Sequence, residues 1–122
     1  MTKTTRVALL LSLLAAMLLA VAGCLEPARP IIACIEVEPT IGYAPLTAAF
    51  DASCTFVPPE RAGAYDYRWE FGDGAEASGR SAFHTFTAPG TYEVFLYIID
   101  MDMGEFEFLA STKRVIVVLP VP

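Results

Sequence analysis

The residues able to do acid, base or nucleophilic chemistry are few in this chain and widely separated. There is one histidine, His84, and there are three cysteines, Cys24, Cys34 and Cys54. A nucleophilic thiol needs a base beside it, and a zinc site needs several His or Cys ligands at short spacing. Neither pattern occurs. We therefore expect no catalytic residue, no metal site built on His84 and no cofactor.

A group of carboxylates offers the other candidate chemistry. Asp100, Asp102 and Glu105 lie around Gly104. The Asp-x-Asp spacing weakly resembles a calcium loop, which supplies oxygen ligands at regularly alternating positions. The next alternating position here is Gly104, and no acidic residue closes the loop at the right distance. The segment is therefore interpreted as a solvated hairpin turn without a metal.

The charge balance excludes one large class of partner. The chain has 122 residues, a size that fits one domain. All 14 acidic residues and 6 of the 8 basic ones follow residue 23, so residues 24–122 carry a formal charge of −8. A protein that binds nucleic acid by charge needs a basic patch to displace counterions. We expect no nucleic-acid partner.

The N-terminal residues form an export signal. Lys3 and Arg6 precede the run 7–23, in which Ser12 has the only polar side chain. This order is typical of a secretory signal peptide, and the run is shorter than the roughly 20 apolar residues that span a bilayer. It ends in Val21-Ala22-Gly23-Cys24, which resembles the lipobox of bacterial lipoproteins. The alternative is an uncleaved membrane helix with an incidental cysteine.

The lipobox resemblance implies that residues 1–23 are removed as a signal peptide and that Cys24 carries acyl chains. Stable anchoring needs more than one chain, and a lipoprotein cysteine supplies two or three. Residues 24–33 contain Pro27 and Pro30 and are predicted to form a short, stiff tether. Leu25 is not an acidic retention signal, which favours the outer membrane or cell surface. The expected partner at this end of the chain is a membrane, reached through the lipid on Cys24.

After residue 33 the hydrophobic period is two, which indicates β-strands. The alternating segments are 35–38, 46–51, 65–71, 92–98 and 106–108, and a continuous β-branched run covers 115–119. Turn-forming glycine and proline residues separate these segments. The pattern predicts an all-β fold, an antiparallel two-sheet sandwich of about seven strands.

The segment Tyr67-Arg68-Trp69-Glu70-Phe71-Gly72-Asp73-Gly74 is similar to the signature of the PKD domain, an immunoglobulin-like sandwich. Three further segments resemble that family in the expected order: 44–53, His84-Thr85-Phe86 and Pro89-Gly90-Thr91-Tyr92. The resemblance covers residues 34–119. It implies a non-catalytic module that serves adhesion, substrate binding or spacing.

The resemblance gives the motif residues structural roles. They are Trp69, Phe71, Gly72, Asp73, Gly74, His84, Pro89, Gly90 and Tyr92. Trp69 fills the space between the sheets, and Gly72 and Gly74 permit positive φ in the turn after it. His84 is expected to form a structural hydrogen bond. Tyr92 is expected to tie a crossing loop to the start of its strand.

With Cys24 assigned to the lipid, Cys34 and Cys54 remain. Cys34 opens the first predicted strand and Cys54 ends the second, so the two residues fall nearly opposite each other if those strands pair through the turn near residues 43–45. An exported protein can form such a disulfide. Two buried free thiols are the alternative.

Apolar residues in predicted loops are the candidate contact sites. Phe56 lies beside Val57-Pro58-Pro59, and Met101 and Met103 lie at a hairpin tip. Further aromatic residues are assigned either to an outer sheet face or to the edge of the core: Tyr65, Tyr97, Phe106 and Phe108.

The first functional hypothesis is a lipid-anchored module that binds a protein or a glycan at the cell surface. The second is a structural or accessory subunit of a protein complex in the envelope. The sequence favours neither strongly, because a fold alone does not determine function.

Overall fold

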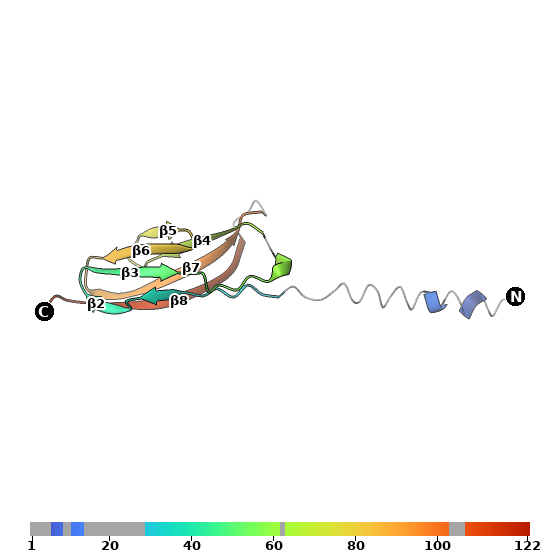
Figure 1. Cartoon of the computed structure of the whole chain (residues 1–122), viewed down its shortest axis with the longest axis horizontal. Coiled ribbons are helices and arrows are strands. Elements are labelled where there is room, and N and C mark those ends of the chain that lie inside the picture. Colours follow the sequence, from blue (N-terminus) through green and yellow to red (C-terminus); the bar gives the residue numbers. More distant parts are fainter. Residues whose placement is uncertain (1–5, 9–10, 14–28, 62, 103–106) are drawn as a thin grey trace.

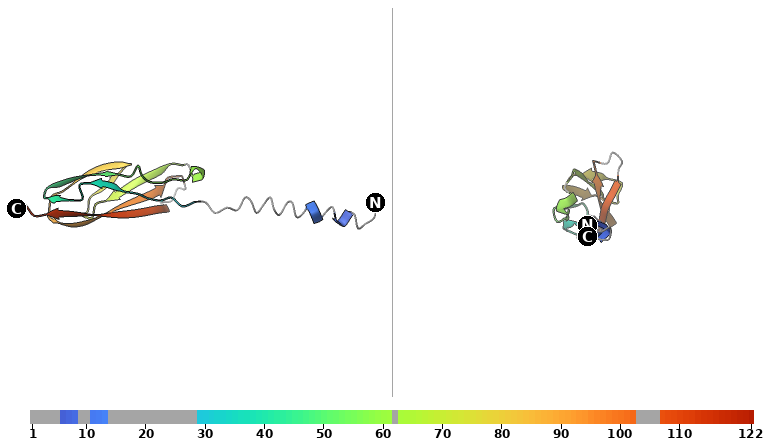
Figure 2. Two further views of the ribbon diagram at one scale, coloured as in Figure 1. Left: turned by 60° about the horizontal axis from the view of Figure 1, so that its bottom comes forward. Right: turned by 90° about the vertical axis from the view of Figure 1, so that its right-hand side faces the viewer.

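The computed structural model describes residues 6–8, 11–13, 29–61, 63–102 and 107–122. Residues 36–119 contain eight strands in two sheets, which confirms the predicted sandwich (Figure 1). Figure 2 shows the same sandwich from two further sides, with the last strand, in red, running along the domain to the C-terminus. Within the described residues, no helix is both long and apolar enough to cross a bilayer.

The smaller sheet has three antiparallel strands in the order β1-β3-β6: β1 is Glu36–Glu38, β3 is Leu46–Asp51 and β6 is Ser81–Phe86. The larger sheet has five strands in the order β2-β8-β7-β4-β5: β2 is Ile41–Tyr43, β8 is Glu107–Leu119, β7 is Gly90–Asp100, β4 is Tyr65–Glu70 and β5 is Glu76–Ser78. β2 pairs with β8 in parallel, and one 3₁₀ turn, Pro59–Arg61, precedes β4.

The core lies between the two sheets and is made of the alternating residues of each strand. β3 contributes Leu46, Ala48 and Phe50, and the other main contributions come from Tyr67, Trp69, Phe71, Phe86, Val94, Leu96, Ile98, Ile116 and Val118. Successive side chains of a strand point to opposite faces. The period of two in the sequence therefore divides each strand into a core face and a solvent face, as predicted.

Trp69 is the largest fully buried side chain. Its ring packs 5.6 Å from the ring of Phe50 on the opposite sheet, and its indole N–H donates a hydrogen bond to the carbonyl oxygen of Gly79 at 2.8 Å. A buried indole needs such an acceptor, because an unpaired buried donor costs about 1–3 kcal/mol. Trp69 therefore joins the two sheets by packing and also holds the chain that leaves β5.

The eight strands agree with the predicted sandwich of about seven, and Ile41–Tyr43, which joins the larger sheet as β2, was not among the predicted segments. One detail of the strand prediction was wrong. Segments 106–108 and 115–119, predicted as separate, lie largely in the single 13-residue strand β8. β8 has a register shift opposite Ile98 and Ile99, which leaves Leu109 as an extra residue. The sequence does not reveal that the strand is continuous, because residues 110–114 are mostly polar and three of their side chains face solvent.

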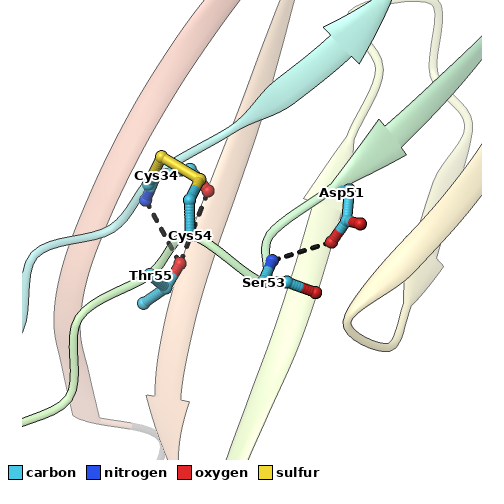
Figure 3. Close-up of a disulfide and its surroundings, with 5 residues drawn as sticks. All are labelled: Cys34, Asp51, Ser53, Cys54 and Thr55. Atoms are coloured by element: carbon cyan, nitrogen blue, oxygen red, sulfur yellow. Dashed lines mark hydrogen bonds between the residues drawn. A yellow bond between two sulfur atoms is a disulfide. The ribbon is translucent and has the colours of Figure 1, made fainter.

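A disulfide joins Cys34 to Cys54, with the two Cα atoms 5.4 Å apart (Figure 3). β1 and β3, which follow Cys34 and precede Cys54, pair as predicted, although β2 lies between them in sequence. The Thr55 hydroxyl accepts a hydrogen bond from Cys34 N–H at 3.2 Å and lies 3.4 Å from the Cys34 carbonyl oxygen, to which it donates. The crosslink thus fixes the first strand at the edge of the small sheet.

The folded domain starts before residue 34. Ile31 is 5% exposed and belongs to the core, and the backbones of Ile32 and Phe56 exchange two hydrogen bonds of 3.0 and 2.9 Å. The predicted tether 24–33 is therefore too long at its C-terminal end, because an apolar residue in a Pro-rich segment packs on the sandwich. Only residues 25–30 are left between Cys24 and the first core residue.

Gly72 and Gly74 lie in the turn that leaves β4, with φ of +83° and +91°. A Cβ atom built at Gly72 would lie 2.7 Å from the carbonyl oxygen of Glu93, whereas one at Gly74 would meet no atom within 4 Å. Gly72 is therefore required for both its conformation and its close approach to β7, and Gly74 for its conformation alone.

We predict that replacing Cys34 and Cys54 with alanine lowers the free energy of unfolding by about 3 kcal/mol, since the disulfide closes a loop of some 20 residues in the unfolded chain. Urea denaturation of the purified oxidised protein and the double variant measures the difference. Equal midpoints for the two proteins would contradict the prediction.

Gly72→Ala is predicted to destabilise the domain more than Gly74→Ala. The left-handed conformation costs a non-glycine residue roughly 1–2 kcal/mol at either position, and only Gly72→Ala adds a collision with backbone. Thermal unfolding of the two variants compares them directly. The reverse order would show that the approach of Gly72 to Glu93 is not tight.

Candidate binding surface

His84 and Asp73 form the pair of described side chains best suited to acid–base chemistry. His84 Nε2 lies 2.6 Å from Asp73 Oδ2, and the imidazole stacks on Phe71 with the ring centroids 4.1 Å apart. Asp73 Oδ1 accepts a hydrogen bond from Ala75 N–H at 3.0 Å. Among the described residues, neither member of the pair hydrogen-bonds a serine, threonine or cysteine side chain. The hydrogen bond between Asp73 and His84 therefore links the turn after β4 to strand β6.

The electrostatics of the pair fit this structural role. Partial burial raises the pKa of Asp73, but hydrogen bonds from His84 and Ala75 and the charge of His84 outweigh burial and hold that pKa below its ordinary value. A carboxylate with a depressed pKa stabilises the fold above its unfolded pKa, and this stabilisation is lost as the pH falls through the folded pKa. At neutral pH Asp73 is a charged acceptor.

Tyr92 holds the loop before its own strand. Its hydroxyl donates to the carbonyl oxygen of Ala88 at 2.6 Å, across Pro89 and Gly90. Its ring packs 4.6 Å from Phe86. These motif residues are engaged in holding the turns, so they leave no free functional group for a ligand.

The three predicted contact residues lie in different surroundings. Phe56 is 44% exposed in the loop between β3 and β4, with its backbone paired to Ile32, and Met101 is 55% exposed just after β7. Met103 lies outside the described residues, as does Phe106.

The carboxylates considered as a calcium loop bind backbone groups. Asp100 accepts a hydrogen bond from the N–H of Asp102, and Asp102 accepts one from the N–H of Ala64. Glu105 is also outside the described residues, and the described part of the chain contains no cluster of three potential metal ligands.

A row of aromatic side chains covers the outer face of the larger sheet. We call it the aromatic row; it consists of Phe95 and Tyr97 on β7 and Phe108 on β8. The rings of Phe95 and Tyr97 are nearly parallel, with centroids 6.0 Å apart, and Phe108 meets Tyr97 at 5.2 Å. Phe108 is 64% exposed. None of the three side chains belongs to the core cluster between the sheets, and Phe95 and Tyr97 are half-buried, so Phe108 is the ring most available for contacts outside the domain.

The aromatic row adjoins a hollow of about 560 Å³, lined by Thr91, Phe95 and three glutamates, Glu70, Glu76 and Glu93, together with the backbone of the Gly72–Gly74 turn. We call this the acidic hollow. The Tyr97 hydroxyl donates to Glu70 at 3.3 Å. Partial burial raises the pKa of Tyr97, and the neighbouring charge of Glu70 raises it further, so Tyr97 remains a donor at neutral pH.

Two basic residues partly neutralise the acidic hollow. Lys113 Nζ lies 2.9 Å from Glu93 and 5.9 Å from the centre of the Phe95 ring, and Arg68 lies 2.8 Å from Glu76. Glu70 has no such cationic partner among the described residues. The surface thus combines aromatic rings with hydrogen-bond acceptors, the composition of a binding site for an uncharged polar ligand.

The sequence indicated part of this surface. Tyr97 and Phe108 were candidates for an outer face, but Phe95, Glu70 and Glu93 were missed. The sequence did contain a signal for them. Along their strands these residues alternate with the core positions Val94, Leu96 and Trp69, so their side chains had to face solvent.

A family model of the PKD domain matches residues 28–113. No match was found among curated protein sequences.

Several solved structures share the fold. The PKD1 domain of the metalloprotease PrtV from Vibrio cholerae is 19% identical with a TM-score of 0.54, and the match covers 74% of this chain and 98% of that one. The PKD1 domain of Vibrio anguillarum Epp is 22% identical with a TM-score of 0.56, covering 79% and 100%. A structure described as a carbohydrate-binding module of the β-sandwich superfamily is 23% identical with a TM-score of 0.62. The match covers 78% of this chain but only 36% of that one.

The matched family model covers most of the chain. The chain therefore belongs to the PKD-domain family, whose domain is a non-catalytic β-sandwich interaction module.

Proposed function

We propose that this protein is a lipid-anchored, extracytoplasmic module that binds a neutral glycan of the cell envelope through the aromatic row and the acidic hollow. The observation that carries the proposal is the aromatic row itself: three rings on a sheet face outside the core, of which Tyr97 lies beside both Phe95 and Phe108. An exposed apolar patch of this kind marks an interaction site.

The N-terminal pattern supports the anchor, and the disulfide supports the extracytoplasmic location. The lipobox-like segment ends at Cys24, which lies outside the described residues. The Cys34–Cys54 disulfide is typical of an oxidising compartment outside the cytoplasm. Since the core begins at Ile31, residues 25–30 span at most about 20 Å when fully extended, at roughly 3.5 Å per residue. Such an anchor would hold the domain close to the membrane surface.

The chemistry of the outer face favours a neutral glycan. Aromatic rings pack against the apolar C–H faces of sugars, and carboxylates accept hydrogen bonds from their hydroxyl groups. Glu70, Glu76 and Glu93 repel an anionic polysaccharide, as does the formal charge of −8 on residues 24–122. The similarity to a carbohydrate-binding module supports the same ligand class, although at this identity it shows the fold alone.

A protein partner in the envelope is the second candidate. Ile41, Tyr43 and Val115 are each about half exposed, and their strands β2 and β8 are neighbours in the sheet that carries the aromatic row. They extend the apolar surface toward the C-terminal end of the domain. An accessory subunit of an envelope complex would use this larger area rather than the acidic hollow.

Mass spectrometry of the mature protein tests the anchor. We expect an N-terminus at Cys24 with acyl chains attached, and we expect Cys24→Ala to leave residues 1–23 uncleaved and the protein unlipidated. A mature protein that retains residues 1–23 and has an unmodified Cys24 would contradict the lipoprotein assignment.

Binding to a panel of immobilised neutral and anionic polysaccharides tests the surface. Phe108→Ala and Tyr97→Ala are expected to weaken retention on the neutral polysaccharide that binds by tenfold or more, because each removes a stacking ring, and about 1.4 kcal/mol corresponds to a factor of ten. Tyr97→Phe keeps the ring and separates stacking from the hydroxyl.

Phe83→Ala and Phe56→Ala are the matched controls, since Phe83 is 79% and Phe56 44% exposed and both lie outside the larger sheet. They are expected to bind like the parent protein. If no polysaccharide binds, or if the control changes weaken binding as much as Phe108→Ala does, the aromatic row is not the site.

A further inference from the structure

The free edges of the two sheets differ in how well they are protected from pairing with another strand. Natural proteins protect such edges with short strands, charges, proline or bulges. β1, β2 and β5 are three residues long, and β1 and β5 carry glutamates. The unpaired stretch of β8 carries Lys113 and Arg114 and follows the irregularity at Leu109. Each of these edges has at least one protective feature.

β6 is the exception. Its six residues, Ser81 to Phe86, include no aspartate, glutamate, lysine or arginine and no proline. It pairs with β3 through six consecutive residue pairs without a register shift, and among the described residues no strand pairs with its other side. It is therefore a regular edge strand, and its neighbour along this margin is β5 of the other sheet (Figure 1).

The directions of the backbone groups on β6 follow from its ladder. Ala52 N–H donates to the carbonyl oxygen of Arg80, and these two residues lie opposite each other in the β3–β6 register. Because hydrogen-bonded and non-hydrogen-bonded pairs alternate in an antiparallel ladder, Ala82, His84 and Phe86 bond β3. The N–H and C=O groups of Ser81, Phe83 and Thr85 consequently point away from the sheet. No backbone hydrogen bond satisfies them within the described part of the chain.

The side chains of the same three residues lie on the outer face. Ser81, Phe83 and Thr85 are all exposed, and Phe83, at 79%, is the most exposed large apolar side chain of the described residues. Phe83 lies opposite Ala49 of β3, so it stands on the sheet without a large neighbour there. The edge thus offers three donor–acceptor residues and one aromatic anchor, in the spacing of a β-strand.

The charges of the small sheet favour a basic partner. Its outer face carries Asp51 on β3, next to β6, and Glu36 and Glu38 on β1 at the far edge, whereas the nearest basic residue, Arg80 before β6, lies over the Tyr67 ring and near Asp51. A second copy of the domain would bring the same acidic face. A separate extended segment with basic residues avoids this repulsion.

We propose that β6 is a docking edge for an extended, basic segment of a partner protein, which adds to the small sheet as a fourth strand beside β6. Main-chain hydrogen bonds to Ser81, Phe83 and Thr85 give the affinity, as in other cases of strand addition. An apolar side chain of the segment packs on Phe83, and its lysine or arginine residues face the acidic surface. This site is on the opposite sheet from the aromatic row and does not depend on glycan binding.

Amide hydrogen exchange of the full chain in mild detergent provides the test. The probe is a synthetic peptide that alternates lysine or threonine with valine, and the controls are a glutamate-for-lysine version and a scrambled version without alternation. Without peptide, the amides of Ser81, Phe83 and Thr85 should exchange quickly, and those of Ala82, His84 and Phe86 slowly. The basic alternating peptide should slow exchange of the first set at least tenfold, and the controls should not.

Phe83→Pro is the variant expected to lose peptide binding. The N–H of Phe83 is unbonded, so a proline at this edge position is compatible with the fold, but proline has no N–H to donate to an added strand. We expect it to abolish the protection, while Val115→Pro on the free stretch of β8 leaves it intact. The proposal is overturned if the peptide protects none of the three amides, or if Phe83→Pro binds like the parent. Concentration-dependent protection without peptide would show that a second copy occupies the edge, and would also overturn it.

Discussion

The two sheets are held together by the aromatic contact between Trp69 and Phe50, and most other features of the domain depend on this contact. The Trp69 ring is fully buried against the opposite sheet, and its N–H fixes the chain at Gly79, two residues before β6 begins. Burying a ring of this size removes on the order of 200 Å² from water. Trp69 is the largest fully buried side chain of the described residues, so the neighbouring turns must adapt to it.

The turns adapt through glycine and through a charged hydrogen bond. Gly72 lets the chain pass close to Glu93 after Phe71 has entered the core, and Asp73 then reaches His84 on β6. The disulfide and Ile31 close the opposite end of the sandwich by attaching the N-terminal segment to the small sheet. The groups that might have done chemistry, the histidine, its carboxylate and two of the cysteines, are used to hold this scaffold. The two surfaces proposed for function are one sheet face with three aromatic residues and one strand edge without protection.

These two surfaces suit different ligands because they offer different groups. The outer face of the larger sheet presents rings and carboxylates, and its backbone is already paired within the sheet. The β6 edge presents backbone donors and acceptors at the repeat of a polypeptide. A sugar matches the first arrangement and an extended peptide the second. A module held near a membrane could in this way bind both an envelope glycan and an envelope protein.

The sequence by itself determined the fold class, much of the core and the family. Alternation with a period of two assigns Leu46, Ala48 and Phe50, or Val94, Leu96 and Ile98, to the buried side without any knowledge of their neighbours, and the motif from Trp69 to Gly74 identifies the turn. It also allowed the Cys34–Cys54 pair to be proposed. Only the tertiary structure decided that Ile41–Tyr43 crosses to the larger sheet, that Phe95, Tyr97 and Phe108 meet, and that β6 ends its sheet unpaired. Periodicity is a property of one strand, whereas adjacency and free edges depend on which strands pair, and that is decided by long-range packing between residues far apart in the chain.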